Sequence, residues 1–467
     1  MLRFAPSPTG DMHIGNLRAA IFNYIIAKQT NQKFLIRIED TDLARNIEGK
    51  DKEILSLLNL FGLLWDNLIY QSHNFDKHRQ LAQYLIEKDL AFYCYCSREF
   101  LESKRELAKA QKKPFRYDMQ WAELEKHTNK NPVIRIKGAT STISFEDAIK
   151  GHLSFEPHEI DSFVIIKEDG IPTYNFACAV DDMLYDVSFV VRGEDHVSNT
   201  PRQILIHRAL GYEKVLGYAH LPIILGESGS KMSKRDSASS VAWLLEQGFL
   251  PQAIINYLIS MGNHTPQEVF KLQESFAWFD IKNIAKSPVK FDIKRLRFLN
   301  REHLKMLNEQ EFALLVDSKD SSVGALAKLH LQEASTLNEI REKLDKIFAP
   351  KCIQRAENGE SYIEECKILY AILCEMIESK DLDLQDYESL KNALMQRSNL
   401  KGKKFFKPLR ILLTGQTHGL ELSEIYPYLR FFLKDIVRLD RNAIADSNAD
   451  STQAIKNQAI KNQTIKN

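Results

Sequence analysis

The spacing of apolar residues over the first forty positions predicts a strand, a helix and a second strand. Residues 2–5 are a short apolar run, and apolar positions then recur at helical spacing from residue 17 to residue 28. Residues 34–38 are a second apolar run, which ends in the acidic cluster 39–42. This is the pattern of a βαβ unit. Because ligands of such sheets bind at the carboxyl ends of the strands, we expect a site beside the loop 6–10.

Further along, the pattern changes from mixed to helical. Residues 91–171 combine short strands with a charged helix, and residues 187–191 predict another strand. Thr200-Pro201-Arg202-Gln203 resembles a capping box with proline at the first helical position, and so predicts the start of a helix. After about residue 239 the spacing is helical almost throughout, which marks a domain boundary. The simplest interpretation is a nucleotide-binding domain interrupted by an insert and followed by helices.

The bulk properties are those of an ordinary soluble chain with several domains. It has 467 residues, 44% of them hydrophobic and 27% charged. No apolar run approaches the roughly 18 residues of a membrane span, and the N-terminus lacks the apolar core of a signal peptide, so we expect a cytoplasmic protein with no membrane partner. The net charge of +1 leaves room for local basic surfaces. Residues 453–467 repeat a pentad, too short a period for a solenoid, and predict a flexible tail.

The first candidate motif is His13-Ile14-Gly15-Asn16, which follows the loop 6–10 and opens the predicted helix. A glycine lets the backbone approach a nucleotide closely, and a helix N-terminus offers unpaired N–H groups. A histidine beside it can donate to a phosphate oxygen as charge builds in a transition state. A lone surface histidine carries no such meaning, and only this strand–loop–helix setting gives the motif weight.

The second candidate motif is Lys231-Met232-Ser233-Lys234-Arg235, after the predicted apolar strand 221–225. Three cations in five residues are usually a solvated loop. At the carboxyl end of a strand, however, mobile lysines can clamp a triphosphate and stabilise the pentavalent phosphorus. The two motifs together therefore predict a nucleotide site.

These two motifs resemble the signatures of class I aminoacyl-tRNA synthetases, and the flanking segments resemble the bacterial glutamyl branch. Those segments run in the family's order: 3–10, 37–42, 172–177 and 192–196. The resemblance extends from residue 2 to about residue 438. It implies ATP-dependent activation of L-glutamate and its transfer to the 3′ end of tRNA(Glu), with Mg²⁺ accompanying ATP. It also implies His13, Lys231 and Lys234 as catalytic residues, with Gly15, Ser233 and Arg235 beside them at ATP.

The same resemblance assigns a glutamate pocket. It implies that Arg3 and Arg192 bind carboxylates, that Glu39 faces the ammonium group, and that Ser7 and Tyr174 supply hydroxyls. Chemistry agrees, because the planar fork of arginine meets a carboxylate at two points. Discrimination against glutamine would come from unmatched charge and hydrogen bonds.

Three positions depart from the family pattern. Asn16 ends the first motif where histidine is common, at a position that varies within the glutamyl branch. Cys178 stands where some relatives carry asparagine near the amino acid. Cys94-Tyr95-Cys96 resembles half of a zinc site, but the segment 116–121 supplies no further ligand, and two ligands do not make a tetrahedral site. We therefore predict no zinc, and buried or free thiols.

The expected fold class is an α/β Rossmann-type catalytic domain with an inserted α+β acceptor-binding domain, followed by an all-α anticodon-binding region. The expected segments are 1–90 and 172–238 for the catalytic domain, 91–171 for the acceptor-stem insert, 239–310 for a helical stem-contact domain, 311–440 for the anticodon-binding region and 441–467 for the tail. The basic segments 290–305 and 401–410 are candidate RNA surfaces, although Phe405 and Phe406 could equally be core.

Several alternatives stay open. One is relaxed or dedicated glutamylation of tRNA(Gln), feeding an amidotransferase, which the resemblance to the epsilon-proteobacterial branch favours. Another is a non-catalytic tRNA-binding paralogue, although both signatures are intact. A shortened homologue that modifies an anticodon nucleoside, and glutamine–tRNA ligase with its β-barrel anticodon domain, both disagree with the helical C-terminal half. A monomer is typical of the family.

Overall fold

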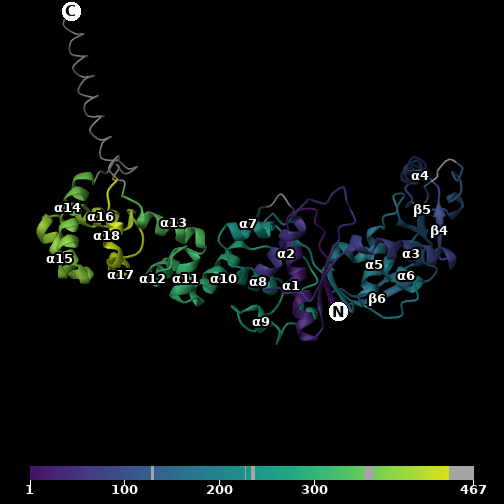
Figure 1. Cartoon of the computed structure of the whole chain (residues 1–467), viewed down its shortest axis with the longest axis horizontal. Helices are drawn as coiled ribbons and strands as arrows, with labels where there is room; N and C mark the ends of the chain where they lie inside the picture. Colours follow the sequence, from purple (N-terminus) through teal and green to yellow (C-terminus); the bar gives the residue numbers. More distant parts are fainter. Residues whose placement is uncertain (128–130, 227, 233–236, 352–361, 441–467) are drawn as a thin grey trace, which may run out of the picture. The chain divides into compact units, whose positions relative to one another are not determined.

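The chain folds as two compact units, which Figure 1 shows in a computed structural model. The first unit comprises Met1–Glu246 and Leu250–Leu299, and the second comprises Gln247–Phe249 and Asn300–Asn467. Within these bounds the structure describes residues 1–127, 131–226, 228–232, 237–351 and 362–440. The predicted tail, 441–467, lies outside the described residues. The division at Leu299 falls inside the predicted segment 239–310, and the predicted segment boundaries stay predictions.

The first unit is built on a seven-stranded sheet in the order β3-β2-β1-β9-β10-β6-β7. All neighbouring strands pair in parallel except the antiparallel pair β6 and β7. The strands are β1 (Leu2–Phe4), β2 (Phe34–Ile38), β3 (Asn67–Tyr70), β6 (Ile143–Asp147), β7 (Gly151–Phe155), β9 (Phe189–Gly193) and β10 (Gly217–Leu221). The apolar runs 2–5 and 34–38 are therefore β1 and β2, as predicted. The strands β6 and β7 lie within the predicted insert, yet they extend this sheet.

Two expectations about strands need correction. The strand predicted at 187–191 begins two residues later, as β9. The single strand predicted at 221–225 is wrong, because β10 ends at Leu221 and a separate short strand, β11 (Ile224–Leu225), pairs in parallel with β12 (Val289–Lys290). The intervening Pro222 has no N–H to donate to a ladder, so a break at this point agrees with its chemistry.

Helix α1 (Ile14–Gln29) is the helix predicted from the spacing after residue 17, and it is buried on almost all sides. His13 caps its N-terminus, with the ring Nδ1 accepting a hydrogen bond from the backbone N–H of Gly15. Further along the helix, the side-chain amide of Asn23 donates to the carbonyl oxygen of Val191 in β9 at 3.0 Å. The helix is thus fixed against the sheet, which places its N-terminus beside the ends of β1 and β9.

The first unit contains eight further named α-helices within its described residues. They are α2 (Lys50–Leu60), α3 (Phe75–Glu87), α4 (Arg98–Ala110), α5 (Tyr174–Leu184), α6 (Thr200–Ala209), α7 (Val241–Glu246), α8 (Pro251–Ser260) and α9 (Leu272–Ser275). A second, antiparallel sheet has the order β4-β5-β8, formed by Ala91–Cys94, Val133–Ile136 and Phe163–Ile166. It belongs to the predicted insert.

Cys94 and Cys96 are buried free thiols beside this small sheet. They pack with Tyr117 and Leu101, and the partly buried Trp121 lies against them. The hydroxyl of Tyr117 donates to the Cys94 sulfur at 3.0 Å. The prediction of buried or free thiols is therefore confirmed, whereas the absence of zinc stays a prediction.

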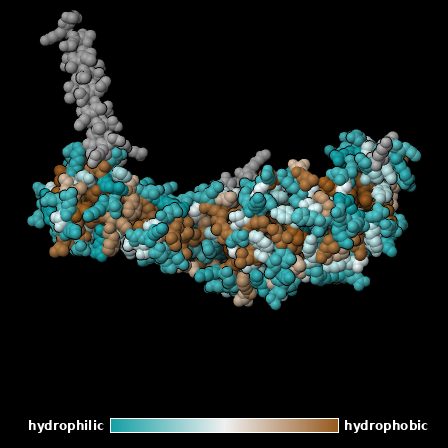
Figure 2. Space-filling view, viewed as in Figure 1, coloured by the Kyte–Doolittle hydropathy of each residue, from teal (hydrophilic) through white to brown (hydrophobic). Residues whose placement is uncertain are grey.

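The second unit is helical, as predicted. Its helices are the end of α10 (Ile293–Met306), α11 (Glu309–Leu315), α12 (Ser321–Leu329), α13 (Leu337–Phe348), α14 (Ile363–Ser379), α15 (Tyr387–Ser398), α16 (Lys403–Thr414), α17 (Leu422–Leu429) and α18 (Leu433–Ile436). In α16, Phe405 is fully buried, whereas 42% of Phe406 is exposed, so only the first is core. On the face seen in Figure 2, hydrophilic side chains cover much of each unit. Among the described residues, no helix is both long and apolar enough to cross a bilayer.

Candidate active site

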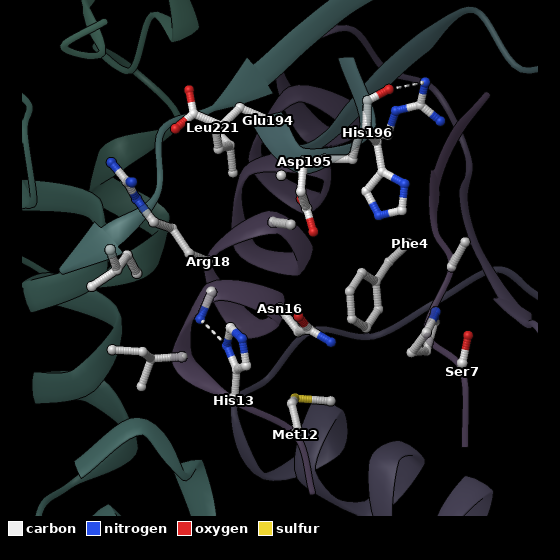
Figure 3. A pocket seen from close by; sticks show the side chains of 18 of the residues that line it. Phe4, Ser7, Met12, His13, Asn16, Arg18, Glu194, Asp195, His196 and Leu221 are labelled. Carbon is white, nitrogen blue, oxygen red and sulfur yellow. Dashed lines mark hydrogen bonds between the residues drawn. The ribbon is translucent and has the colours of Figure 1, made fainter. Parts of the chain in front are cut away.

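A cavity of about 520 Å³ lies at the carboxyl ends of β1, β9 and β10 in the first unit. Its wall includes the loop after β1, the first turn of α1 and the segment after β9, and Figure 3 shows side chains from these elements around it. Eight residues predicted from the sequence line this one cavity: Arg3, Ser7, His13, Gly15, Glu39, Tyr174, Arg192 and Lys231. Ser233, Lys234 and Arg235 lie outside the described residues.

His13 is oriented by its own helix. Its Nδ1 accepts from the backbone N–H of Gly15 at 2.9 Å, so the proton of the neutral ring lies on Nε2. A methyl group on Gly15 would lie 2.6 Å from Cε1 of this ring. The sequence argument gave Gly15 the role of letting a nucleotide approach, but in the structure the glycine makes room for the histidine. His13 Nε2 is thereby set as a donor.

Arg3 and Arg37 share one buried carboxylate. Asp182 accepts from Arg3 Nε at 3.2 Å and from Arg37 Nη1 at 2.5 Å. Burial alone would raise the pKa of Asp182, but the two guanidinium groups hold it below its ordinary value. Glu39 accepts from Arg37 Nη2 at 3.0 Å, and burial raises the pKa of Glu39 against the pull of Arg37 and Arg3. These two cations and two anions therefore balance.

Cys178 lies inside this cluster. The thiol is 1% exposed and accepts from Arg37 Nη2 at 3.1 Å, and burial raises its pKa to about 11. At neutral pH the thiol is therefore protonated and adds no charge to this cluster.

Arg192 is held by neutral acceptors. Its Nε donates to His220 Nε2 at 3.2 Å, Nη1 donates to Gln203 Oε1 at 2.9 Å, and Nη2 donates to Thr200 Oγ1 at 2.7 Å. Thr200 and Gln203 are the two ends of the capping box predicted from the sequence. The helix α6 does begin at Thr200, but the capping box is wrong, because Asn199 is the N-cap, without a side-chain cap hydrogen bond, and both side chains turn to Arg192. The first turn of this helix therefore also holds a residue that lines the cavity, Arg192.

Tyr174 and His196 meet at the edge of the cavity. The Tyr174 hydroxyl lies 3.1 Å from His196 Nδ1. Burial lowers the pKa of His196 to about 4, helped by the charge of Arg192, and burial raises the pKa of Tyr174. Both groups are therefore neutral near pH 7. In Figure 3 the side chains of His196, Asp195 and Phe4 lie around the same space as those of Asn16 and His13.

Comparison with known proteins identifies the family of this chain. The model of the catalytic domain of class I tRNA synthetases (E and Q) matches residues 1–298, and the model of an anticodon binding domain matches residues 299–429. The chain belongs to the class I tRNA synthetases. Such enzymes use ATP.

Several proteins are similar in sequence to this synthetase over nearly the whole chain. It is 83% identical to glutamate–tRNA ligase 2 of Helicobacter hepaticus, over 94% of this chain and 100% of that protein, and 66% identical to glutamate–tRNA ligase 2 of Wolinella succinogenes, over 94% and 99%. It is 56% identical to a glutamyl/glutaminyl-tRNA synthetase of Helicobacter pylori, over 94% and 100%. A crystal structure of a glutamate tRNA ligase from Elizabethkingia meningosepticum has the same fold, with a TM-score of 0.78, 24% identity, and coverage of 95% of this chain and 98% of that one.

Several residues of the synthetase site escaped the sequence argument. Asp182 and Arg37 hold Arg3 and Glu39, yet they lie on α5 and in the middle of β2, where an apolar spacing is the stronger signal. Asp147 and His220 form a buried contact between a carboxylate and an imidazole, in two strands of the main sheet. A polar residue inside an apolar strand was the one available sign, because a buried polar group needs partners.

Proposed function

We propose that this synthetase activates L-glutamate with ATP and transfers the glutamyl group to the 3′ end of a tRNA. The observation that carries the proposal is the meeting of Arg3, Arg192 and Glu39 in the cavity that also contains the His13–Gly15 turn. A substrate with two carboxylates and one ammonium group matches a wall of this kind, since each substrate charge finds the opposite charge.

Arg192 is the proposed partner of the side-chain carboxylate. Within the part of the chain that the structure describes, its hydrogen-bond acceptors are neutral and none is a carboxylate, so its charge is available to an incoming anion. Glutamine would place a neutral amide there and leave that charge unmatched. Glu39 is the proposed partner of the ammonium group. Its raised pKa reflects burial, and a substrate cation would favour its ionised form.

Two chemical steps follow from the proposal. An oxygen of the α-carboxylate attacks the α-phosphorus of ATP, forming glutamyl-adenylate and releasing pyrophosphate. A terminal ribose hydroxyl of the tRNA then attacks the carbonyl carbon of the mixed anhydride, forming the ester and releasing AMP. Positioning and charge stabilisation carry most of this catalysis.

His13 is the proposed donor to a phosphate oxygen, through Nε2–H, because Gly15 occupies Nδ1. Lys231 lines the same cavity and is exposed, so it can reach the phosphates. Lys234, Ser233 and Arg235 are assigned to ATP from the resemblance alone. Mg²⁺ is proposed to accompany ATP, held chiefly by phosphate oxygens.

The identity of the tRNA has two candidates, tRNA(Glu) and tRNA(Gln). Two relatives are named as a second glutamate–tRNA ligase, and the Helicobacter pylori relative has a name that joins glutamyl and glutaminyl. An organism with two such enzymes can devote one to tRNA(Gln), so these names favour the second candidate. The proposed RNA surfaces are the basic segments 290–305 and 401–410, and the proposed enzyme is a cytoplasmic monomer.

Charging assays with purified tRNA(Glu) and tRNA(Gln) transcripts and radiolabelled glutamate, at one fixed low salt concentration, test both parts of the proposal. Charging of tRNA(Gln), alone or together with tRNA(Glu), would support an enzyme that feeds an amidotransferase. Charging of tRNA(Glu) alone would refute that role and keep glutamate ligation. Charging of neither, with no glutamate-dependent exchange of pyrophosphate into ATP, would refute the proposed activity and favour a tRNA-binding protein.

A further inference from the structure

A buried chain of contacts runs from Asp147 through His220 to Arg192. Asp147 is the last residue of β6, His220 lies in the neighbouring β10, and Arg192 lies in β9 on the other side of β10. Asp147 Oδ2 lies 2.6 Å from His220 Nδ1, and His220 Nε2 lies 3.2 Å from Arg192 Nε. The side chains of Asp147 and His220 are both fully buried, whereas Arg192 lines the cavity.

The carboxylate of Asp147 is saturated with donors. Its Oδ1 accepts from the backbone N–H groups of Ile149 at 3.0 Å and Lys150 at 2.8 Å, and its Oδ2 accepts from the backbone N–H of His220 at 3.1 Å. A carboxylate with these partners stays ionised and can only accept. The ring nitrogen of His220 that faces it, Nδ1, must therefore carry a proton.

This arrangement fixes the tautomer of His220. Burial lowers the pKa of His220 despite the opposing effect of Asp147, so the ring is neutral and carries one proton. With that proton on Nδ1, Nε2 has a lone pair, which accepts from Arg192 Nε. The other tautomer would place an N–H against an N–H at this contact. Thr200 Oγ1, 3.1 Å from Nε2, lies on the same side of the ring.

The contacts from Asp147 through His220 also leave the positive charge of Arg192 largely unneutralised. Arg3 and Arg37 are oriented by direct contact with Asp182, which neutralises them in part. Arg192 instead meets a neutral ring, and the carboxylate lies one ring further away. An imidazole between a carboxylate and a cation orients the cation while leaving most of its field for another anion.

We propose that Asp147 and His220 are positioning residues for glutamate binding, which hold the guanidinium of Arg192 towards the side-chain carboxylate of the substrate. This inference rests on the proposed function, because it assigns that carboxylate to Arg192. It adds two residues, neither of which lines the cavity, to the determinants of amino-acid affinity.

Two kinds of substitution distinguish a positioning role of Asp147 and His220 from a role in packing. Two variants break the chain of contacts to Arg192, and one supplies an acceptor for Arg192 again. Asp147→Asn keeps the size of the side chain, but an amide cannot accept from the backbone N–H groups on one side and from His220 Nδ1–H on the other. His220→Asn can still donate to Asp147 but is too short to reach Arg192. His220→Gln places an amide oxygen near the position of Nε2, and so supplies an acceptor for Arg192 again.

The experiment measures glutamate affinity by calorimetry, and the KM for glutamate and for ATP together with kcat in pyrophosphate exchange, on the full chain with tRNA present. For Asp147→Asn and His220→Asn we expect the dissociation constant and the KM for glutamate to rise about 10- to 100-fold, the cost of a weakened hydrogen bond to a charged group. The kcat and the KM for ATP should stay near the wild-type values, since the lost contact acts equally on ground state and transition state. His220→Gln should recover part of the affinity.

Asp181→Asn is the matched control. Asp181 is a second fully buried carboxylate of the first unit that contacts a buried histidine, His78, at 2.9 Å. Its substitution should lower the melting temperature and leave the affinity for glutamate unchanged.

The outcomes separate the two hypotheses. Unchanged glutamate affinity in Asp147→Asn and His220→Asn, or an equal loss in Asp181→Asn, would overturn the positioning role. If the wild-type enzyme binds glutamate but shows no exchange, the proposed function fails and the calorimetric comparison still decides the positioning role. If the wild-type enzyme does not bind glutamate, both fail.

Discussion

Replacement of Asp182 by asparagine is the sharpest test of how the proposed glutamate pocket is built. The wild-type cluster contains two buried cations, Arg3 and Arg37, and two buried anions, Asp182 and Glu39. The variant keeps the shape of the side chain but leaves one buried positive charge in excess. Its amide N–H₂ must also point at one guanidinium group, where donor would face donor.

The size of the effect follows from this burial. Removal of one partner from a buried ion pair typically costs about 3–5 kcal/mol. The side chains of Asp182 and Arg37 are 2% and 0% exposed, so solvent does little to reduce that cost on their side. Because Arg3 lines the cavity, water there solvates part of the excess charge. We therefore expect the free energy of unfolding to fall by about 3 kcal/mol.

Tryptophan fluorescence during urea unfolding is a suitable assay. The chain has four tryptophans, Trp65, Trp121, Trp243 and Trp278, and all lie in the first unit. Their signal therefore reports the unit that contains Asp182, whatever the second unit does. Asp186→Asn is the control, because Asp186 pairs with Lys214 at the surface, and an exposed pair contributes little.

The pH dependence of the stability difference between wild type and Asp182→Asn provides a second test. The folded-state pKa of Asp182 is depressed, so its contribution is present above the unfolded pKa of about 3.9 and is lost as pH falls through the folded value. The gap in stability between wild type and Asp182→Asn should therefore be full at pH 7 and should shrink below about pH 4. Equal stabilities at pH 7, or a gap that does not change on acidification, would refute this account.

Three further predictions concern single side chains. Gly15→Ala should lower kcat of pyrophosphate exchange by about 100-fold with an unchanged KM for glutamate, because the new methyl group displaces the ring of His13; retention of kcat would contradict this. Arg192→Lys should raise the KM for glutamate by about 100-fold, because an ammonium group cannot meet the four neutral acceptors and a carboxylate together; a change below threefold would count against the proposed pocket. Cys178 should resist alkylation at pH 8 in the folded protein, because it is buried with a pKa of about 11, while the partly exposed Cys374 reacts first, as peptide mass spectrometry can measure.

Local sequence predicted the parts of the site that are local in structure. The strand β1, the helix α1 and the strand β2 follow from spacing within a window of a few residues, and His13 and Gly15 contact one another across two positions. Resemblance to a family added Arg3 and Arg192, whose roles no spacing could reveal.

The residues that orient those arginines could not be predicted in this way. Asp182 lies 179 positions from Arg3, and Asp147 lies 73 positions from His220. The order of strands decides which side chains meet, and β6 reaches β10 only because it joins the main sheet instead of staying within the insert. The segment that begins with Thr200 correctly predicted the start of a helix, but the side chains of Thr200 and Gln203 bind Arg192 instead of capping that helix.

The two arginines of the pocket illustrate opposite solutions to one electrostatic problem. A buried cation without a partner is costly, yet a cation fully paired with a carboxylate has little attraction left for a substrate anion. Arg3 is stabilised by a shared carboxylate, so it contributes shape and hydrogen bonds more than net charge. Arg192 is stabilised by neutral oxygens and a neutral imidazole, so it keeps its charge. A site that must distinguish a carboxylate from an amide needs a cation of the second kind, and the Asp147–His220 pair is how this fold can bury one.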